Sequence, residues 1–125
     1  MIKLEKKRIL VVEDDPEIRY VITSSLQNAG FEVLEAEHAL EAICSMVRQR
    51  VDLVLMDIRM PVLDGIALVR ELKAHDDTRH VPVVAVTGLD TPEDRSAAFD
   101  AGCVGYITKP MDMVHFASQV AAFIR

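Results

Sequence analysis

Short apolar runs alternate with longer amphipathic segments along the chain, and this alternation is the feature that most constrains the fold. Most of the runs are apolar throughout, which is typical of strands buried on both faces of a sheet. Each following segment repeats its apolar residues three and four positions apart, as one face of a helix does. The expected strands span 9–12, 31–36, 53–56, 83–86 and 104–108. The expected helices begin at Pro16, at Ala39, after Gly65, at Pro92 and at about Met111, and the last one ends at Ile124.

Five strand-then-helix units predict an α/β protein in which helices cover both faces of a parallel sheet. Right-handed crossovers leave few ways to connect five such strands, and we expect the flavodoxin-like order 2-1-3-4-5. The run 31–36 is more polar than the others, which favours an edge position in that order. The predicted fold class is therefore a flavodoxin-like (βα)5 three-layer sandwich.

Length and charge narrow the classes of protein further. The 125 residues are enough for one domain, expected to span 1–125, and the formal net charge of −6 disfavours binding to nucleic acid or to anionic membranes. The basic start is followed by only four apolar residues and then by acids, too few for a signal peptide or a membrane span. Cys44 and Cys103 lack metal-ligand spacing. We expect reduced thiols, with Cys103 buried, in a cytoplasmic protein.

Polar side chains follow four of the expected strands at the point where each strand ends. They are, in chain order, Glu13, Asp14, Asp15, Asp57, Thr87 and Lys109. The carboxyl ends of parallel strands meet at one edge of a sheet, where ligands bind, so we expect most of these side chains to converge there. Three adjacent acids cannot all point inward, and Asp15 is expected to face solvent.

Gathered carboxylates require cations, because two of them about 4 Å apart repel by on the order of 4 kcal/mol at an effective dielectric near 20. Lys109 supplies one positive charge. Mg²⁺ is the divalent ion that fits carboxylates, a backbone carbonyl and a phosphate oxygen. Acids, a lysine, a hydroxyl and a metal together favour phosphoryl transfer to an aspartate, which forms an acyl phosphate.

Four strings of residues stand at the ends of the expected strands in a characteristic order. They are Ile9–Asp15, Leu55–Pro61 with Asp64 and Gly65, Val86–Gly88, and Tyr106–Pro110. In this order they resemble the receiver domain of bacterial two-component response regulators, of the chemotaxis type, over about residues 7–124. The resemblance implies a phosphoacceptor in two-component or phosphorelay signalling, which is not an enzyme beyond its own phosphorylation and dephosphorylation.

The resemblance also implies a role for each residue at this edge. Asp57 would accept a phosphoryl group from a histidine of a sensor histidine kinase or a histidine phosphotransfer protein. Mg²⁺, or Mn²⁺ in its place, would be held by Asp57, by Asp14, by Glu13 through water and by the backbone carbonyl of Arg59.

On the phosphate side, the Thr87 hydroxyl would bond one oxygen and Lys109 would pair with another. Gly88 is small, which would keep the phosphate reachable. Pro110 resembles the family's cis-proline, which would aim the lysine side chain.

Tyr106 matches the aromatic residue that switches in this family, where the ring turns inward as Thr87 moves toward the phosphate. The alternative is a half-buried strand aromatic with no switching role. The changed surface would comprise the helix from Pro92, the strand 104–108 and the last helix, and it would bind a downstream protein or form a homodimer on phosphorylation. The last helix carries more apolar residues than one core-facing stripe needs, which indicates either core packing or a partner.

Arg59 and Leu89 occupy positions that tune the lifetime of the phosphoryl group in this family. Neither is an acid or an amide that could guide a water, so we predict a long-lived phosphoryl group.

Two competing functions fit the sequence less well, and the context of the chain remains open. A non-phosphorylated interaction module of the same fold would lack Asp57, Lys109 or the acidic pair, and all are present. A hydrolase of the haloacid-dehalogenase type would need an aspartate where Glu13 stands, and Asp57 would then have no role. The chain is either a stand-alone regulator or a receiver excised from a larger response regulator or hybrid histidine kinase.

Overall fold

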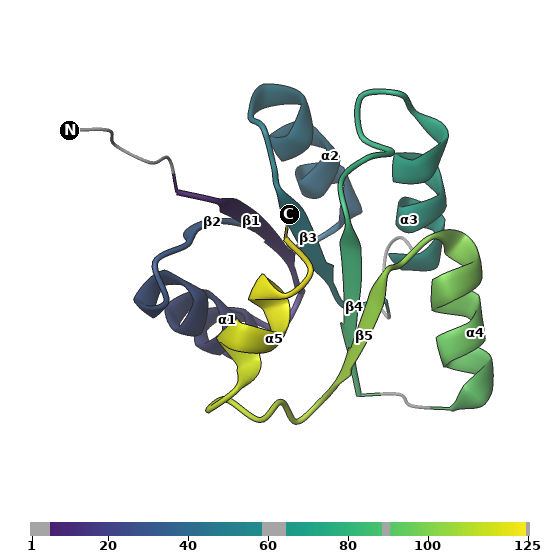
Figure 1. The fold of residues 1–125 in the computed structure, drawn as a ribbon. Coiled ribbons are helices and arrows are strands. Elements are labelled where there is room, and N and C mark those ends of the chain that lie inside the picture. Colours follow the sequence, from purple (N-terminus) through teal and green to yellow (C-terminus); the bar gives the residue numbers. More distant parts are fainter. Residues whose placement is uncertain (1–5, 59–64, 89–90, 125) are drawn as a thin grey trace.

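The computed structural model describes residues 6–58, 65–88 and 91–124, and all five strand-then-helix units are present in that part of the chain (Figure 1). The bounds of all five strands lie within one residue of those expected from the sequence. The elements in chain order are β1 (Arg8–Val12), α1 (Pro16–Asn28), β2 (Glu32–Ala36), α2 (Ala39–Arg48), β3 (Leu53–Met56), α3 (Gly65–Ala74), β4 (Val83–Thr87), α4 (Pro92–Ala101), β5 (Gly105–Thr108) and α5 (Phe116–Ala121).

The strands form one parallel sheet in the order β2-β1-β3-β4-β5, which confirms the predicted topology. β1 lies between β2 and β3, so that Ile9 is opposite Val33 on one side and opposite Leu53 on the other. The strand order reverses between β1 and β3. The carboxyl ends of these two strands are therefore the expected place for a ligand.

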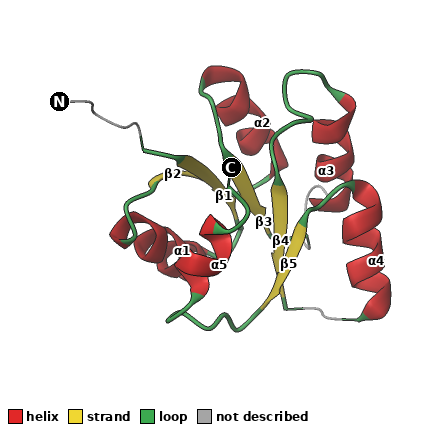
Figure 2. Ribbon diagram, viewed as in Figure 1, coloured by secondary structure: helices red, strands yellow, loops and turns green. Residues whose placement is uncertain are grey.

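Helices cover both faces of the sheet and complete three layers (Figure 2). α1 and α5 pack on one face, where Val11 belongs to a buried cluster with Ile22 and Phe116. α2, α3 and α4 pack on the other face, where Val12 belongs to a second cluster with Leu68. Successive strand side chains point to opposite faces, so one apolar run supplies both clusters.

The central strands supply most of the core. Every residue of β3 and β4 is buried, whereas only Ala36 is buried in β2. Burying a Val or Leu side chain contributes about 1.5–3 kcal/mol, so these runs stabilise the fold strongly. The polar character of β2 fits its place at the edge of the sheet, as predicted.

The first helix starts and stops where its sequence signals lie. The Asp15 carboxylate accepts hydrogen bonds from the backbone N–H groups of Glu17 (2.9 Å) and Ile18 (3.3 Å), and Pro16 occupies the first turn. Gly30 follows the helix with φ 99°, a left-handed conformation that favours glycine. Asp15 thus points away from the other acids because it caps α1.

The last helix is shorter than expected, and the prediction of a helix from Met111 to Ile124 was wrong. Residues 113–115 form a turn in which the Asp112 carboxylate accepts from the Val114 N–H (3.1 Å) and the Asp112 carbonyl accepts from the His115 N–H (3.1 Å). Asp bonds readily to nearby backbone groups in this way, which competes with helix formation. α5 therefore begins only at Phe116, although Phe116 itself is buried in the core.

Both cysteines are free thiols, with Cys103 buried as predicted and Cys44 exposed on α2. Among the helices that the structure describes, none has both the length and the apolar character needed to cross a bilayer.

Candidate functional site

Three carboxylates converge at the carboxyl ends of β1 and β3. Glu13 and Asp57 each follow a strand directly, and sheet hydrogen bonding continues through both: the Glu13 N–H donates to the Ala36 carbonyl and the Asp57 N–H to the Val12 carbonyl, each at 3.0 Å. One oxygen from each of Glu13, Asp14 and Asp57 can be chosen so that all three lie within 4.8 Å of one another. Glu13 is buried and Asp14 is exposed, so this set opens to solvent on one side.

Lys109 reaches the same place from the end of β5. Its backbone N–H donates to the Thr87 carbonyl (2.9 Å), which fixes the start of its side chain beside β4. Its ammonium donates to the Glu13 carboxylate and lies 3.3 Å from Asp57 Oδ2. The bond between Lys109 and Pro110 is cis. One ammonium therefore contacts two of the three carboxylates, those of Glu13 and Asp57.

The electrostatics of this cluster follow from burial and from the shortage of positive charge. Burial raises the pKa of the Glu13 carboxyl to about 7 and outweighs the Lys109 ammonium, which lowers it. Burial alone would lower the pKa of Lys109, but its hydrogen bond to Glu13 and the charges of Asp57 and Glu13 raise that pKa above its usual value. A cation that binds the Glu13 carboxylate would therefore compete with its proton near neutral pH.

Thr87 and Gly88 close the site on the β4 side. Thr87 is the last residue of β4 and is buried, opposite Thr108 of β5. No atom of the described residues lies within 4 Å of the position that a Cβ of Gly88 would occupy. The small residue after Thr87 thus leaves open space at the carboxyl edge of the sheet.

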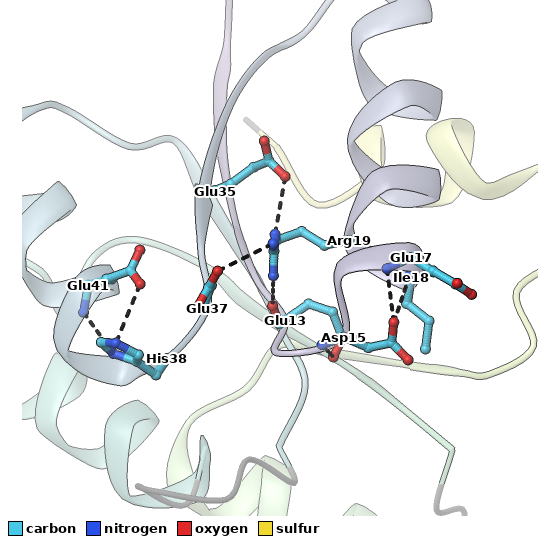
Figure 3. Close-up of polar contacts among 9 residues, drawn as sticks. All are labelled: Glu13, Asp15, Glu17, Ile18, Arg19, Glu35, Glu37, His38 and Glu41. Atoms are coloured by element: carbon cyan, nitrogen blue, oxygen red, sulfur yellow. Dashed lines mark hydrogen bonds and ion pairs between the residues drawn. The ribbon is translucent and has the colours of Figure 1, made fainter.

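Arg19 and Gly65 support the site, and the sequence did not predict either role. Arg19 of α1 donates from Nη1 to the Glu13 carbonyl (2.7 Å) (Figure 3). It also forms ion pairs with Glu35 within β2 (3.3 Å) and with Glu37 just after β2 (3.7 Å). This arginine joins the end of β1 to the end of β2. It could not be found from local patterns, because its partners are brought together only by the sheet.

Gly65 lies directly against the backbone that carries Asp57. A Cβ at Gly65 would lie 2.5 Å from the Ile58 Cα and 2.8 Å from the Asp57 carbonyl oxygen. The Gly65 N–H donates to the Ile58 carbonyl (3.1 Å). In the sequence Gly65 stands out only as part of a motif, and its close approach to the Asp57 backbone explains why a glycine is needed there.

Tyr106 lies on β5 and is half-buried against the cluster beneath α2, α3 and α4. The guanidinium of Arg95 on α4 lies 4.8 Å from the centroid of its ring, within the range of a cation–π interaction. The ring thus joins β5 to α4 on the face predicted to change.

Arg59 and Leu89, for which roles in metal binding and phosphoryl lifetime were predicted, lie outside the described residues.

The comparisons with known proteins agree with this arrangement. The family model of the response regulator receiver domain matches residues 9–121. The chain belongs to this family. Receiver domains are signalling modules that interact with histidine kinases and with downstream effectors.

Relatives of this receiver include stand-alone regulators and parts of larger proteins. It is 30% identical to the polar-differentiation response regulator DivK of Brucella anthropi, over 94% of this chain and 96% of DivK. It also spans about half the length of other curated relatives that it matches, which are described as transcriptional regulators.

Solved structures show the same fold. Chemotaxis protein CheY4 of Vibrio cholerae has a TM-score of 0.91 and 25% identity, over 96% of this chain and all of that one (100%). The receiver domain of a sensor histidine kinase from Pseudomonas aeruginosa PAO1 has a TM-score of 0.86 and 34% identity, over 95% of this chain and 98% of that one. That structure has a magnesium ion coordinated in its active site cleft.

Proposed function

We propose that this receiver accepts a phosphoryl group on Asp57, with Mg²⁺ bound, from a histidine of a sensor histidine kinase or a histidine phosphotransfer protein. The observation that carries the proposal is the convergence of the Glu13, Asp14 and Asp57 carboxylates at one place, where the Lys109 ammonium contacts two of them. Such a cluster is costly unless a further cation binds to it.

The donor set fits a hard divalent cation. Glu13, Asp14 and Asp57 offer carboxylate oxygens, which Mg²⁺ prefers, and Mn²⁺ takes similar ligands. The backbone carbonyl of Arg59 completes the proposed set. When bound, the metal neutralises charge on the phosphoryl oxygens and on the carboxylates.

The transfer itself needs positioning more than covalent chemistry. An oxygen of Asp57 forms a bond to phosphorus as the phosphorus–nitrogen bond of phosphohistidine breaks, and the imidazole keeps the electron pair and takes up a proton. Lys109, already 3.3 Å from Asp57 Oδ2, pairs with one phosphoryl oxygen. The Thr87 hydroxyl bonds another, and the open space beside Gly88 leaves room for the group.

An apolar groove beside Lys109 gives the phosphodonor a surface to bind. It has a volume of about 510 Å³ and is lined by the start of α1 and by the segment after β5, including Ile18, Val21, Met111 and Met113. A helix that carries the donor histidine could bury apolar side chains there while its imidazole reaches Asp57.

Phosphorylation would then change the surface formed by α4, β5 and α5. Thr87 shifts toward the phosphate and the Tyr106 ring turns inward. This movement changes the contact between the Tyr106 ring and Arg95. A downstream protein, or a second copy of the chain, reads the new surface. This function needs neither nucleic acid nor membrane contact, and it places the protein in the cytoplasm either as a stand-alone regulator or as part of a longer one.

Intact mass spectrometry after incubation with acetyl phosphate and Mg²⁺ tests the proposal. We expect a phosphoryl-sized gain that Asp57→Asn abolishes. Asp15→Asn is a matched control, because Asp15 caps α1 instead of joining the other carboxylates, and it should gain the same mass. No gain in the intact protein would contradict the proposal and favour the non-phosphorylated module.

The roles proposed for Arg59 and Leu89 are tested by the decay of that added mass. We expect a long-lived phosphoryl group, and its loss within a minute would contradict this part of the proposal.

A further inference from the structure

Three apolar side chains form a row on the outer face of α2. Leu40 is 67% exposed, Val47 is 81% exposed and Cys44 between them is exposed. Their spacing of four and then three positions places them on one face of the helix. The opposite face of α2 packs on the sheet through the buried Ala39 and Ala42. We call Leu40, Cys44 and Val47 the α2 stripe.

The α2 stripe adds nothing to the core that the fold requires. Single exposed apolar residues are common, but an unbroken row along one helix face is typical of an interaction site. α2 lies on the opposite face of the sheet from α1 and α5 (Figure 1). None of the three residues belongs to the carboxylate cluster or to the face of α4, β5 and α5.

Two opposite charges border the stripe on the same side. Glu41 in the first turn lies 3.4 Å from the ring of His38, which caps the helix (Figure 3). Arg48 in the last turn is exposed and has no ion-pair partner among the residues that the structure describes. A hollow of about 370 Å³ lies along this flank, beside Cys44 and between Glu41 and Arg48.

We propose that a second copy of this chain docks on the α2 stripe, with the two α2 helices antiparallel about a two-fold axis that passes near Cys44. Leu40 then packs against Val47 of the partner subunit, and Cys44 faces Cys44 of the partner subunit. Glu41 pairs with Arg48 of the partner subunit, and the symmetry repeats this pair.

Charge complementarity selects this arrangement over the other symmetric one. A two-fold axis perpendicular to the helices keeps the charged flanks of both copies on one side, and it brings Glu41 of each copy to Arg48 of the other. An axis parallel to the helices would place the flanks on opposite sides and leave these charges apart. The antiparallel pairing therefore gives Arg48 an ion-pair partner and also buries the α2 stripe.

The proposed interface is small, because it involves mainly one helix from each copy. Interfaces below about 1,200 Å² are typical of weak and transient complexes, so the dimer should depend on protein concentration. It should not depend on phosphorylation of Asp57, because no residue of the carboxylate cluster takes part.

Cross-linking through Cys44, with sedimentation velocity over a range of concentrations, tests the proposal. A short bis-maleimide should link two copies through Cys44, because Cys103 is buried and burial raises the pKa of its thiol to about 11. Leu40→Glu should abolish both the cross-link and the sedimenting dimer. An acidic residue is favourable in the first turn of a helix, so this variant should still fold. Tyr20→Glu, at a residue 71% exposed on α1, is the matched control and should leave the dimer intact.

Charge reversal tests the antiparallel register. Glu41→Lys and Arg48→Glu should each weaken dimerisation about tenfold, because each creates two like-charge contacts, and the double variant should restore it. A chain that stays monomeric at all concentrations would overturn the proposal, as would a dimer that survives Leu40→Glu. Failure of the double reversal to restore association would overturn the antiparallel pairing.

Discussion

The two ends of the sheet hold charge in opposite ways. At the amino end, two half-buried charged residues, Asp52 and Lys73, each have hydrogen-bond partners. Asp52 accepts from the Arg8 N–H (2.8 Å) and lies 3.7 Å from Arg50 Nε. The Lys73 ammonium donates to backbone carbonyls, including that of Val81 (2.8 Å). These contacts join the starts of neighbouring strands and the end of α3, and they stabilise the fold.

At the carboxyl end, three carboxylates lie close together, and the Lys109 ammonium contacts only Glu13 and Asp57 among them. Burial, and to a lesser extent the charge of Asp57, raises the pKa of the Glu13 carboxyl to about 7 in spite of the nearby Lys109. The comparison shows where a charge is left to be balanced: the amino-end groups named above have hydrogen-bond or ion-pair partners, whereas the carboxyl end gathers more carboxylates than its one ammonium can pair with until a cation binds.

The largest effect is expected where the carboxyl end is most crowded. Gly65→Ala should lower the free energy of unfolding by about 3 kcal/mol, because its Cβ would meet the backbone of Ile58 and Asp57, which cannot yield as a side chain can. Chemical denaturation measures this loss. Gly88→Ala is the matched control and should be close to neutral, because the space beside Gly88 is open among the described residues. Equal effects of the two variants would contradict the crowding.

The second largest effect is expected from removing the Asp52 carboxylate at the amino end of the sheet. Asp52→Ala should lower the free energy of unfolding by about 2 kcal/mol, because the part-buried N–H of Arg8 loses its acceptor. Denaturant titration provides the measurement, and Asp52→Asn, which retains an acceptor oxygen, should lose much less. If Asp52→Ala left the free energy of unfolding unchanged, the contacts of Asp52 would not stabilise this end of the sheet.

The third effect is a pH dependence that belongs to the carboxyl end. The folded pKa of Glu13, about 7, exceeds its ordinary value of 4.5, so the folded protein binds more protons between these values. The Glu13 contribution to stability is thus present below about pH 4.5 and is lost as the pH rises through 7, with a slope approaching about 1 kcal/mol per pH unit. Without metal, Glu13→Gln should remove this slope from a series of denaturation curves, and an unchanged slope would contradict the assignment.

The smallest effect is expected at the exposed margin of the amino end. Glu32→Gln should lower the free energy of unfolding by about 0.5 kcal/mol, because the Arg8–Glu32 pair at 3.0 Å is largely open to solvent. Thermal denaturation at low and high salt checks this, and high salt should shrink the difference. A loss as large as that of Asp52→Ala would mean that exposed pairs matter as much as buried ones here.

The strand pattern predicted the sheet and most of the site, because in a parallel sheet the residue after each strand has a known place. Glu13, Asp57 and Lys109 could be assigned to one edge for this reason. The start of α5 could not be predicted, because the turn at Asp112 competes with a helix that the apolar spacing would allow. Arg19 could not either, since its partners at the ends of β1 and β2 meet only in the folded sheet.

The most direct test compares the unfolding free energies of the intact protein and of Asp57→Asn, with and without Mg²⁺. Without Mg²⁺, we expect Asp57→Asn to be more stable by about 1 kcal/mol, because it removes a charge that repels its neighbours. With Mg²⁺ at about a hundred times its dissociation constant, the intact protein should gain about 2.7 kcal/mol and become the more stable of the two. A variant that is less stable without Mg²⁺, or an equal gain by both proteins, would contradict the claim that this end of the sheet is built to bind a cation.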